Sequence, residues 1–141
     1  MESYVPTYGS NKPDVSAASV GWQIRHSLKV IISVSKALKR SDPKDYKWTF
    51  NWKRSMMLTI GRFARGKVNS PKHTRTDVDI ESSEVNKLLS QARETMLETE
   101  ILSPTASFPH PIFGSLNLSQ SQKSLALHTY HHLLIIRDIM A

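Results

Sequence analysis

The chain has 141 residues, which fits one domain, because domains usually hold roughly 100–200 residues. It contains no cysteine, which excludes disulfide bonds, thiolate-ligated zinc and a cysteine nucleophile, and its formal net charge is +7. No apolar run reaches the roughly 18 residues of a membrane span, and the opening MESYVPTYGS lacks the pattern of a signal peptide. We therefore expect a cytoplasmic protein with no membrane partner.

The first part of the chain is predicted to be an irregular N-terminal arm at residues 1–16. Pro6, Gly9 and Pro13 prevent a long helix there. Residues 17–141 are predicted to form a single helical-bundle domain, because their apolar residues recur at helical spacing and no segment alternates in the manner of a strand.

The first long helix is predicted to begin after Ser16 or Ser19, since either side chain can cap it, and to end at Arg40. Pro43 lies just beyond and disfavours continuation. The apolar face of this helix is defined by residues spaced three or four apart: Val20, Ile24, Leu28, Ile31, Ser35 and Leu38.

A shorter helix is predicted at residues 52–64, with Gly66 as its terminator. It lies within a basic strip, residues 47–75, which holds no acidic residue. Such a strip could bind nucleic acid or another anion. We favour a solvated face plus a basic loop, because no recognised nucleic-acid motif accompanies the strip, and keep a non-catalytic bundle that binds an anionic partner as the alternative function.

Two further helices complete the predicted fold. One runs from about residue 80 to 102, and Pro104 follows it. A loop rich in proline separates it from the last helix, for which Asn117 and Gln120 read as a capping box and which ends near Met140. The prediction is an all-α protein.

The last helix carries HTYHHLLIIRDI, in which two histidines occupy the middle of the apolar stripe. His128 and His132 lie one helical turn apart and project the same way, whereas His131 lies to one side. This spacing lets two imidazole nitrogens reach one metal ion. The other interpretation is a pair of core histidines bonded to backbone carbonyls or to Ser33 or Gln23. We favour metal on the spacing.

Two ligands from one helix do not close a metal site, so a third must come from elsewhere. The candidates are His26 in the first helix, His73 in the basic loop, His110 in the proline-rich loop, and a carboxylate. His26 lies at the margin of its helix's apolar face, and the other two histidines lie in segments where a surface position is common.

The sequence resembles the DinB-like superfamily of four-helix-bundle metalloproteins, and most closely a branch catalogued as a domain of unknown function. The resemblance covers roughly residues 19–140 and rests on four segments: VGWQIRHSLKVI, FNWKRSMMLTIGRFARGK, FPHPIFGSLN and LHTYHHLLIIRDIM. It implies a four-helix bundle that holds one divalent metal (Zn, Ni or Fe) on His26, His128 and His132, with His110 and His131 at the periphery of the site.

The resemblance also implies an activity. Some relatives in the superfamily are transferases in which the metal activates a small-molecule thiol, and a chain without cysteine would need that thiol from outside. A metal-dependent transferase or hydrolase acting on a small-molecule substrate is therefore expected.

Two departures from the family pattern have consequences. The family's bundle has a full helix before the first ligand histidine, which is short or missing here, and the bare face would favour a homodimer. Many relatives carry Arg-Gly-Gln after the last histidine, where this chain has Leu133, Leu134 and Ile135.

Overall fold

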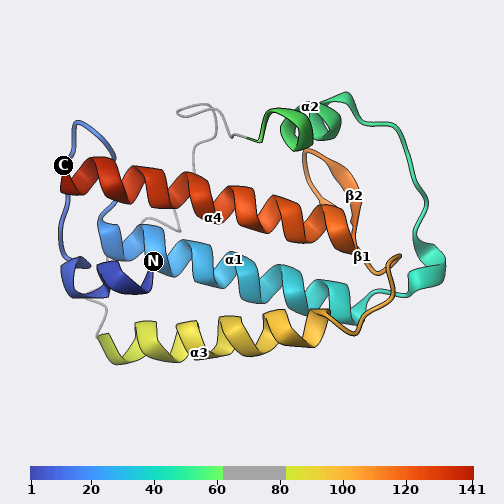
Figure 1. Ribbon diagram of the computed structural model, residues 1–141, viewed down its shortest axis with the longest axis horizontal. Helices are drawn as coiled ribbons and strands as arrows, with labels where there is room; N and C mark the ends of the chain where they lie inside the picture. The colour runs from blue at the N-terminus through green and yellow to red at the C-terminus, as the bar shows by residue number, and fades with distance from the viewer. Residues whose placement is uncertain (62–81) are drawn as a thin grey trace.

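The computed structural model describes residues 1–61 and 82–141, which are mostly helical (Figure 1). The α-helices are α1 (Val20–Arg40), α2 (Trp52–Ile60), α3 (Ser82–Thr99) and α4 (Leu118–Met140), the 3-10 helices are η1 (Glu2–Thr7) and η2 (Pro43–Asp45), and the strands are β1 (Ser107–His110) and β2 (Gly114–Asn117). The prediction of a mostly helical chain is confirmed, while a bundle of the DinB-like type stays a prediction. No described helix combines the length and apolar composition needed to cross a bilayer.

The caps at the starts of α1 and α4 form as their sequences predict. Ser19 accepts a hydrogen bond from the backbone N–H of Trp22 at 3.3 Å, and α1 begins at the next residue. Asn117 and Gln120 form the reciprocal pair of a capping box, with bonds of 2.9 and 3.2 Å, so α4 has a defined first turn.

The ends of α2 and α3 differ from their predictions. Gly61 adopts a left-handed conformation, with φ of 68°, and terminates α2 earlier than the predicted residue 64; Gly66 lies outside the described residues. Helix α3 ends at Thr99 instead of 102, because the next N–H groups make tighter turn bonds, such as Leu102 N–H to Thr99 O at 3.2 Å.

The proline-rich segment, predicted to be a loop, contains the antiparallel hairpin β1–β2. The prediction of no strand was wrong here because each strand has four residues, too few for alternation to be visible. Gly114 takes a positive φ of 70° where the turn joins β2, and Leu116 is fully buried. The hairpin and α2 share a small core of Met57, Phe113 and Leu116.

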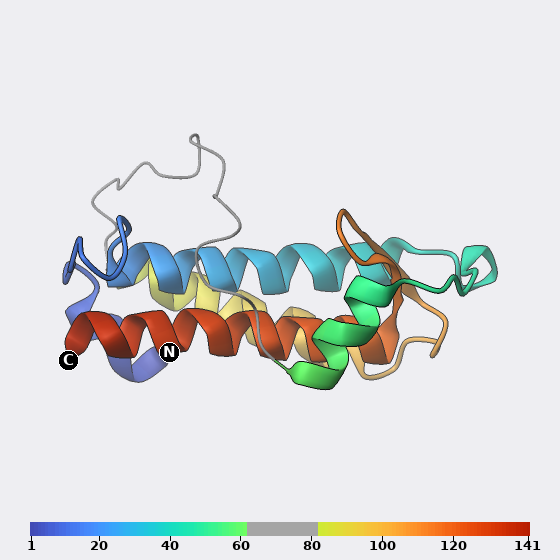
Figure 2. The ribbon, with the colours of Figure 1, turned by 90° about the horizontal axis from the view of Figure 1, so that it is seen from above.

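The three long helices lie side by side, with α1 between α4 and α3 (Figure 1). Helices α1 and α3 run in the same direction and α4 runs opposite, as the colours in Figures 1 and 2 show. Their main core is made of aliphatic side chains from all three helices: Val20, Ile24, Leu28, Ile32, Val85, Ala92, Ile136 and Ile139. Antiparallel packing places the first turns of α1 beside the last turns of α4.

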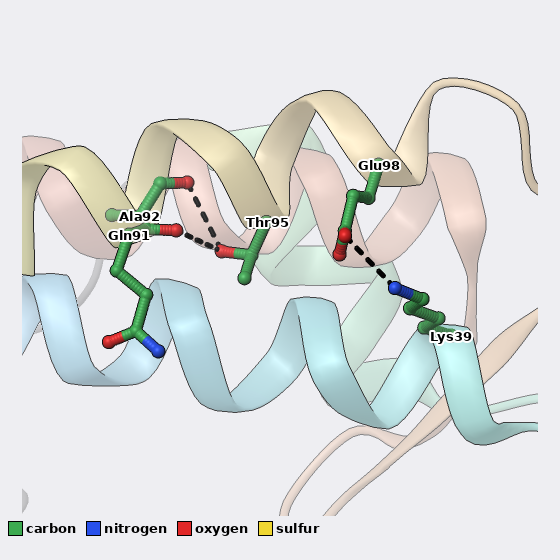
Figure 3. Close-up of polar contacts among 5 residues, drawn as sticks. All are labelled: Lys39, Gln91, Ala92, Thr95 and Glu98. Carbon is green, nitrogen blue, oxygen red and sulfur yellow. Dashed lines mark hydrogen bonds and ion pairs between the residues drawn. The ribbon is translucent and has the colours of Figure 1, made fainter.

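Two kinds of polar contact occur where α1 and α3 pack together (Figure 3). Thr95 is buried and its hydroxyl donates to the carbonyls of Gln91 and Ala92, at 2.9 and 3.2 Å, within its own helix. Near the end of α1, Lys39 pairs with Glu98 at 3.0 Å, and because both side chains are largely exposed the pair contributes little to stability.

The N-terminal arm packs against the start of α1. It holds the short helix η1, and Met1, Tyr4 and Val5 contact the main core. The N–H of Gly21 donates to Tyr8 O at 2.7 Å, and a Cβ at position 21 would lie 2.9 Å from that same oxygen. Glycine is therefore required at this position by the close approach of the backbone.

We predict that Gly21→Ala lowers the free energy of unfolding by on the order of 1 kcal/mol, because the new methyl group must displace the arm's backbone. Urea unfolding followed by circular dichroism measures the change. Gly9→Ala is the matched control, since nothing lies within 4 Å of a Cβ there. An equal effect of the two substitutions would contradict this account of the arm.

Candidate metal centre

The antiparallel contact between α1 and α4 gathers three histidines into one cluster. His26 comes from the second turn of α1, and His128 and His132 come from successive turns of α4. One ligand nitrogen from each lies within 4.8 Å of the other two. His132 is buried, at 6% exposed, and the other two are half-buried, so the cluster reaches solvent on one side.

The spacing of the two α4 histidines matches a shared ion. His128 Nε2 and His132 Nε2 are 3.3 Å apart. Two nitrogens that bind one tetrahedral zinc ion at about 2.0–2.1 Å are roughly 3.3 Å from each other. Their rings are 4.5 Å apart between centroids, and the His26 ring lies 4.9 Å from that of His132 and 5.3 Å from that of His128. The three side chains are thus close enough to bind one metal ion.

A hydrogen-bonded chain from α1 sets the tautomer of His132. The Nδ1 atom of His132 lies 2.5 Å from Gln23 Oε1. An amide oxygen only accepts, so Nδ1 carries the proton and the lone pair is on Nε2, toward His128. The Gln23 amide is oriented in turn by donating from Nε2 to Ser16 Oγ at 3.1 Å.

Gln23 therefore reconciles the two interpretations that the sequence left open. It is the hydrogen-bond partner expected of a core histidine, whereas Ser33 is exposed. Yet it uses only the nitrogen of His132 that points away from the cluster. A ligand histidine commonly donates its second N–H to a neighbouring oxygen in this way, which holds the ring in place.

Trp22 forms an apolar wall beside the cluster. Its ring stacks on that of His26, with centroids 4.7 Å apart and an angle of 5° between planes, and lies 6.1 Å from the ring of His132. Trp22 itself is buried. The two α1 side chains are four positions apart, so the helix places them one above the other.

Burial keeps all three imidazoles neutral. Desolvation lowers the pKa of His128 to about 4 and that of His132 to about 2, and the charge that a neighbouring histidine would carry lowers both further. Burial also lowers the pKa of His26 below its usual 6.5. Neutral imidazoles at neutral pH have the free lone pairs that metal ligation requires.

The two histidines predicted at the periphery have different surroundings. The His131 ring lies 5.4 Å from that of His132 but is not one of the three clustered ligands. His110 Nδ1 accepts from the N–H groups of Ile112 and Phe113, at 3.1 and 3.3 Å, and so closes the β1–β2 turn. Both are still near enough that their positive charge would lower the pKa of His128. His73, also considered as a ligand, lies outside the described residues.

Two residues of the site were not recognised from the sequence. Trp22 precedes His26 by four positions, a spacing that indicates contact along a helix. Ser16 was considered only as a helix cap, but its hydroxyl orients Gln23. Gln23 was among the hydrogen-bond partners considered for the histidine pair, whereas nothing in the periodicity indicates the role of Ser16.

The basic strip lies only partly within the described residues, up to position 61. There Lys47 and Lys53 are exposed. Arg54 is 3% exposed, and its guanidinium donates to Ser115 O at 3.1 Å and to Thr49 O. Arg54 is therefore used within the fold and does not face an anionic partner.

Comparison with protein-family models finds none that matches the chain, and no curated protein or solved structure matches it. The resemblance to the DinB-like superfamily thus stays a prediction that rests on the sequence segments.

We predict that Gln23→Ala weakens zinc binding by about 10–100-fold, because His132 loses the acceptor that holds its ring and tautomer. Gln23→Glu keeps an acceptor oxygen at the same place and should retain the affinity. Competition titration with a chromophoric chelator measures both dissociation constants. Equal losses in the two variants would show that Gln23 acts only through packing.

We predict that the metal-free protein loses stability as the pH falls from about 6.5 toward 4. In this range the unfolded chain protonates its histidines near pH 6.5, whereas folded His128 has a pKa of about 4, so the unfolded state binds more protons. Urea unfolding in the presence of a chelator gives the profile. The control is a His128→Gln, His132→Gln variant, whose profile should be flatter; parallel profiles would contradict the prediction.

Proposed function

We propose that this chain is a metal-dependent enzyme of the DinB-like kind, with one divalent ion (Zn, Ni or Fe) held by His26, His128 and His132. The observation that carries the proposal is the convergence of these three side chains from two helices, with ligand atoms within 4.8 Å of one another. The sequence segments that resemble the superfamily support the same set of ligands.

The donor set favours a catalytic ion over a structural one. Structural zinc sites are usually closed by four protein ligands, whereas catalytic sites use three and leave a position open. Among the described residues, the cluster consists of histidines and no carboxylate joins it. Such an ion would keep its full double positive charge and would lower the pKa of a water or thiol bound to it.

Other side chains around the histidine cluster have supporting roles. Gln23 orients His132, and Trp22 shields one side of the cluster from water. The half-exposed sides of His26 and His128 face the direction from which a small-molecule substrate would enter. His131 and His110 lie at the periphery, where they would contact the substrate.

The reaction class within this proposal is thiol transfer or hydrolysis. The chain has no cysteine, so a sulfur nucleophile would have to be an external small-molecule thiol. Buried, neutral ligands and a site open on one side suit either reaction.

We predict that protein purified without an affinity tag contains about one divalent ion per chain, measured by elemental mass spectrometry. His128→Ala and His132→Ala should each weaken binding by more than about 100-fold, since losing a ligand costs more than losing a residue behind it. His131→Ala is the control and should leave the metal content unchanged, because its ring, although 5.4 Å from that of His132, is not one of the three clustered ligands.

Metal that stays bound in the His128→Ala, His132→Ala double variant would contradict the proposal.

The reaction class is then examined with the cobalt(II)-loaded protein. A thiol-to-cobalt charge-transfer band on adding glutathione would favour thiol transfer, and its absence would favour hydrolysis.

A further inference from the structure

The N-terminal arm reaches the histidine cluster through a chain of hydrogen bonds. Ser16, the last residue of the arm, accepts from Gln23 Nε2 at 3.1 Å, and Gln23 Oε1 lies 2.5 Å from His132 Nδ1. Gln23 is only 2% exposed, so its amide depends on these two protein partners for its hydrogen bonds. The position of an arm residue is therefore transmitted to a ligand ring through one buried side chain.

Ser16 is itself held in place by a turn of the arm. Its hydroxyl accepts a second bond, from the N–H of Ala18 at 3.1 Å, and its own N–H donates to Lys12 O at 3.0 Å. The N–H of Val15 donates to the same carbonyl at 2.8 Å, and the Val15 side chain packs against the main core. The hydroxyl is thus fixed relative to the arm and moves only if this turn moves.

The arm lies against the first turns of α1, at the end of the molecule where α4 terminates (Figure 1). The N–H of Val20 donates to Ser10 O at 2.9 Å. The N–H of Gly21 donates to Tyr8 O at 2.7 Å. A short segment docked by such contacts opens locally at a lower free energy than the packing of long core helices. Each time the arm opens, the Ser16 hydroxyl leaves with it.

We propose that the N-terminal arm is part of the metal centre, with Ser16 as a positioning residue that acts through Gln23 on His132. Metal binding and docking of the arm then strengthen each other, because the ion favours the ring position that the docked arm holds. Such coupling is reciprocal: the factor by which docking tightens ion binding equals the factor by which the ion stabilises docking. The inference rests on the proposed function in requiring that the three clustered histidines bind an ion.

A second hydroxyl near the start of α1 provides the matched control. Ser19 accepts from the N–H of Trp22 at 3.3 Å and caps the helix, whereas the bond to Gln23 is made by Ser16. Removing either hydroxyl disturbs the beginning of α1. A loss of metal affinity that is specific to Ser16 therefore reports the chain of hydrogen bonds and not a general loosening of the helix.

Titration of zinc against a chromophoric chelator tests the role of Ser16 in the full chain. Ser16→Ala should raise the dissociation constant about threefold to tenfold, which is less than the loss of about 10–100-fold expected when a direct partner of a ligand is removed. Ser16→Thr keeps the hydroxyl and should stay within about twofold of wild type, as should Ser19→Ala. No loss from Ser16→Ala, or an equal loss from Ser19→Ala, would overturn the proposal.

A double-mutant comparison shows whether Ser16 acts through Gln23. Once Gln23→Ala has removed the connecting side chain, adding Ser16→Ala should change the dissociation constant by less than about twofold. Additive losses would show that Ser16 acts by another route and would overturn the proposal. Wild-type protein that binds zinc and does not respond to Ser16→Ala overturns this inference alone, whereas wild-type protein that binds no zinc removes the proposed function as well.

Amide hydrogen exchange gives the reciprocal measurement. The N–H of Ala18 donates to the Ser16 hydroxyl and so reports docking of the arm. Zinc should slow its exchange in wild-type protein by about the factor that Ser16→Ala costs in affinity. The N–H of Ser41, which donates to Leu38 O at the opposite end of α1, is the control and should change by less than about twofold. An Ala18 amide whose exchange zinc leaves unchanged would overturn the proposal.

Discussion

The buried hydrogen bond between His132 and Gln23 is the contact on which the arrangement of α1 and α4 depends. It is a buried polar contact beside the aliphatic main core, so a shift of one helix along the other would leave two buried polar groups unpaired, at a cost of about 1–3 kcal/mol for each group. Apolar packing alone tolerates such shifts. The bond therefore fixes the register that brings His26 level with the two histidines of α4, and the cluster follows from that register.

At the other end of the molecule, the hairpin has the corresponding role. His110 accepts two backbone hydrogen bonds in the turn and stacks on Phe113 at 4.4 Å, so the F-x-H-P-x-F-G segment forms a rigid unit. Arg54 then attaches α2 to this unit through Ser115 O. Two of the segments on which the family resemblance rests therefore stabilise the fold. The histidine in one of them, His110, closes a turn and does not join the ligand cluster.

Much of the fold could be predicted from the sequence, because α1, α3 and α4 have long amphipathic patterns and two of them have clear caps at Ser19 and Asn117. The side on which His128 and His132 lie also followed from helical periodicity. The inclusion of His26 did not follow from periodicity, since its position at the margin of the apolar face leaves its direction open. Only the rotation of α1 against α4 decides that direction.

The hairpin was missed because four-residue strands carry too little pattern. The early end of α2 was missed because Gly61 and Gly66 are equally good terminators by composition. The orientation of α2 has a related explanation: Met56 and Ile60 are apolar but exposed, and nothing in the local sequence shows that Arg54 takes the buried side.

The separation of the cluster along the chain has a consequence for how the protein is made. Gln23 and His132 are 109 positions apart, and α4 is the last helix of this sequence to leave the ribosome. Until then, α1 has no partner for its histidine-bearing side, and Gln23 has no imidazole to hold. Contacts between such distant parts of a chain form late, because a long loop must close before they contribute. The cluster therefore cannot form in a partly synthesised chain. Tight binding of an ion by all three histidines would require that α1 and α4 have already packed together.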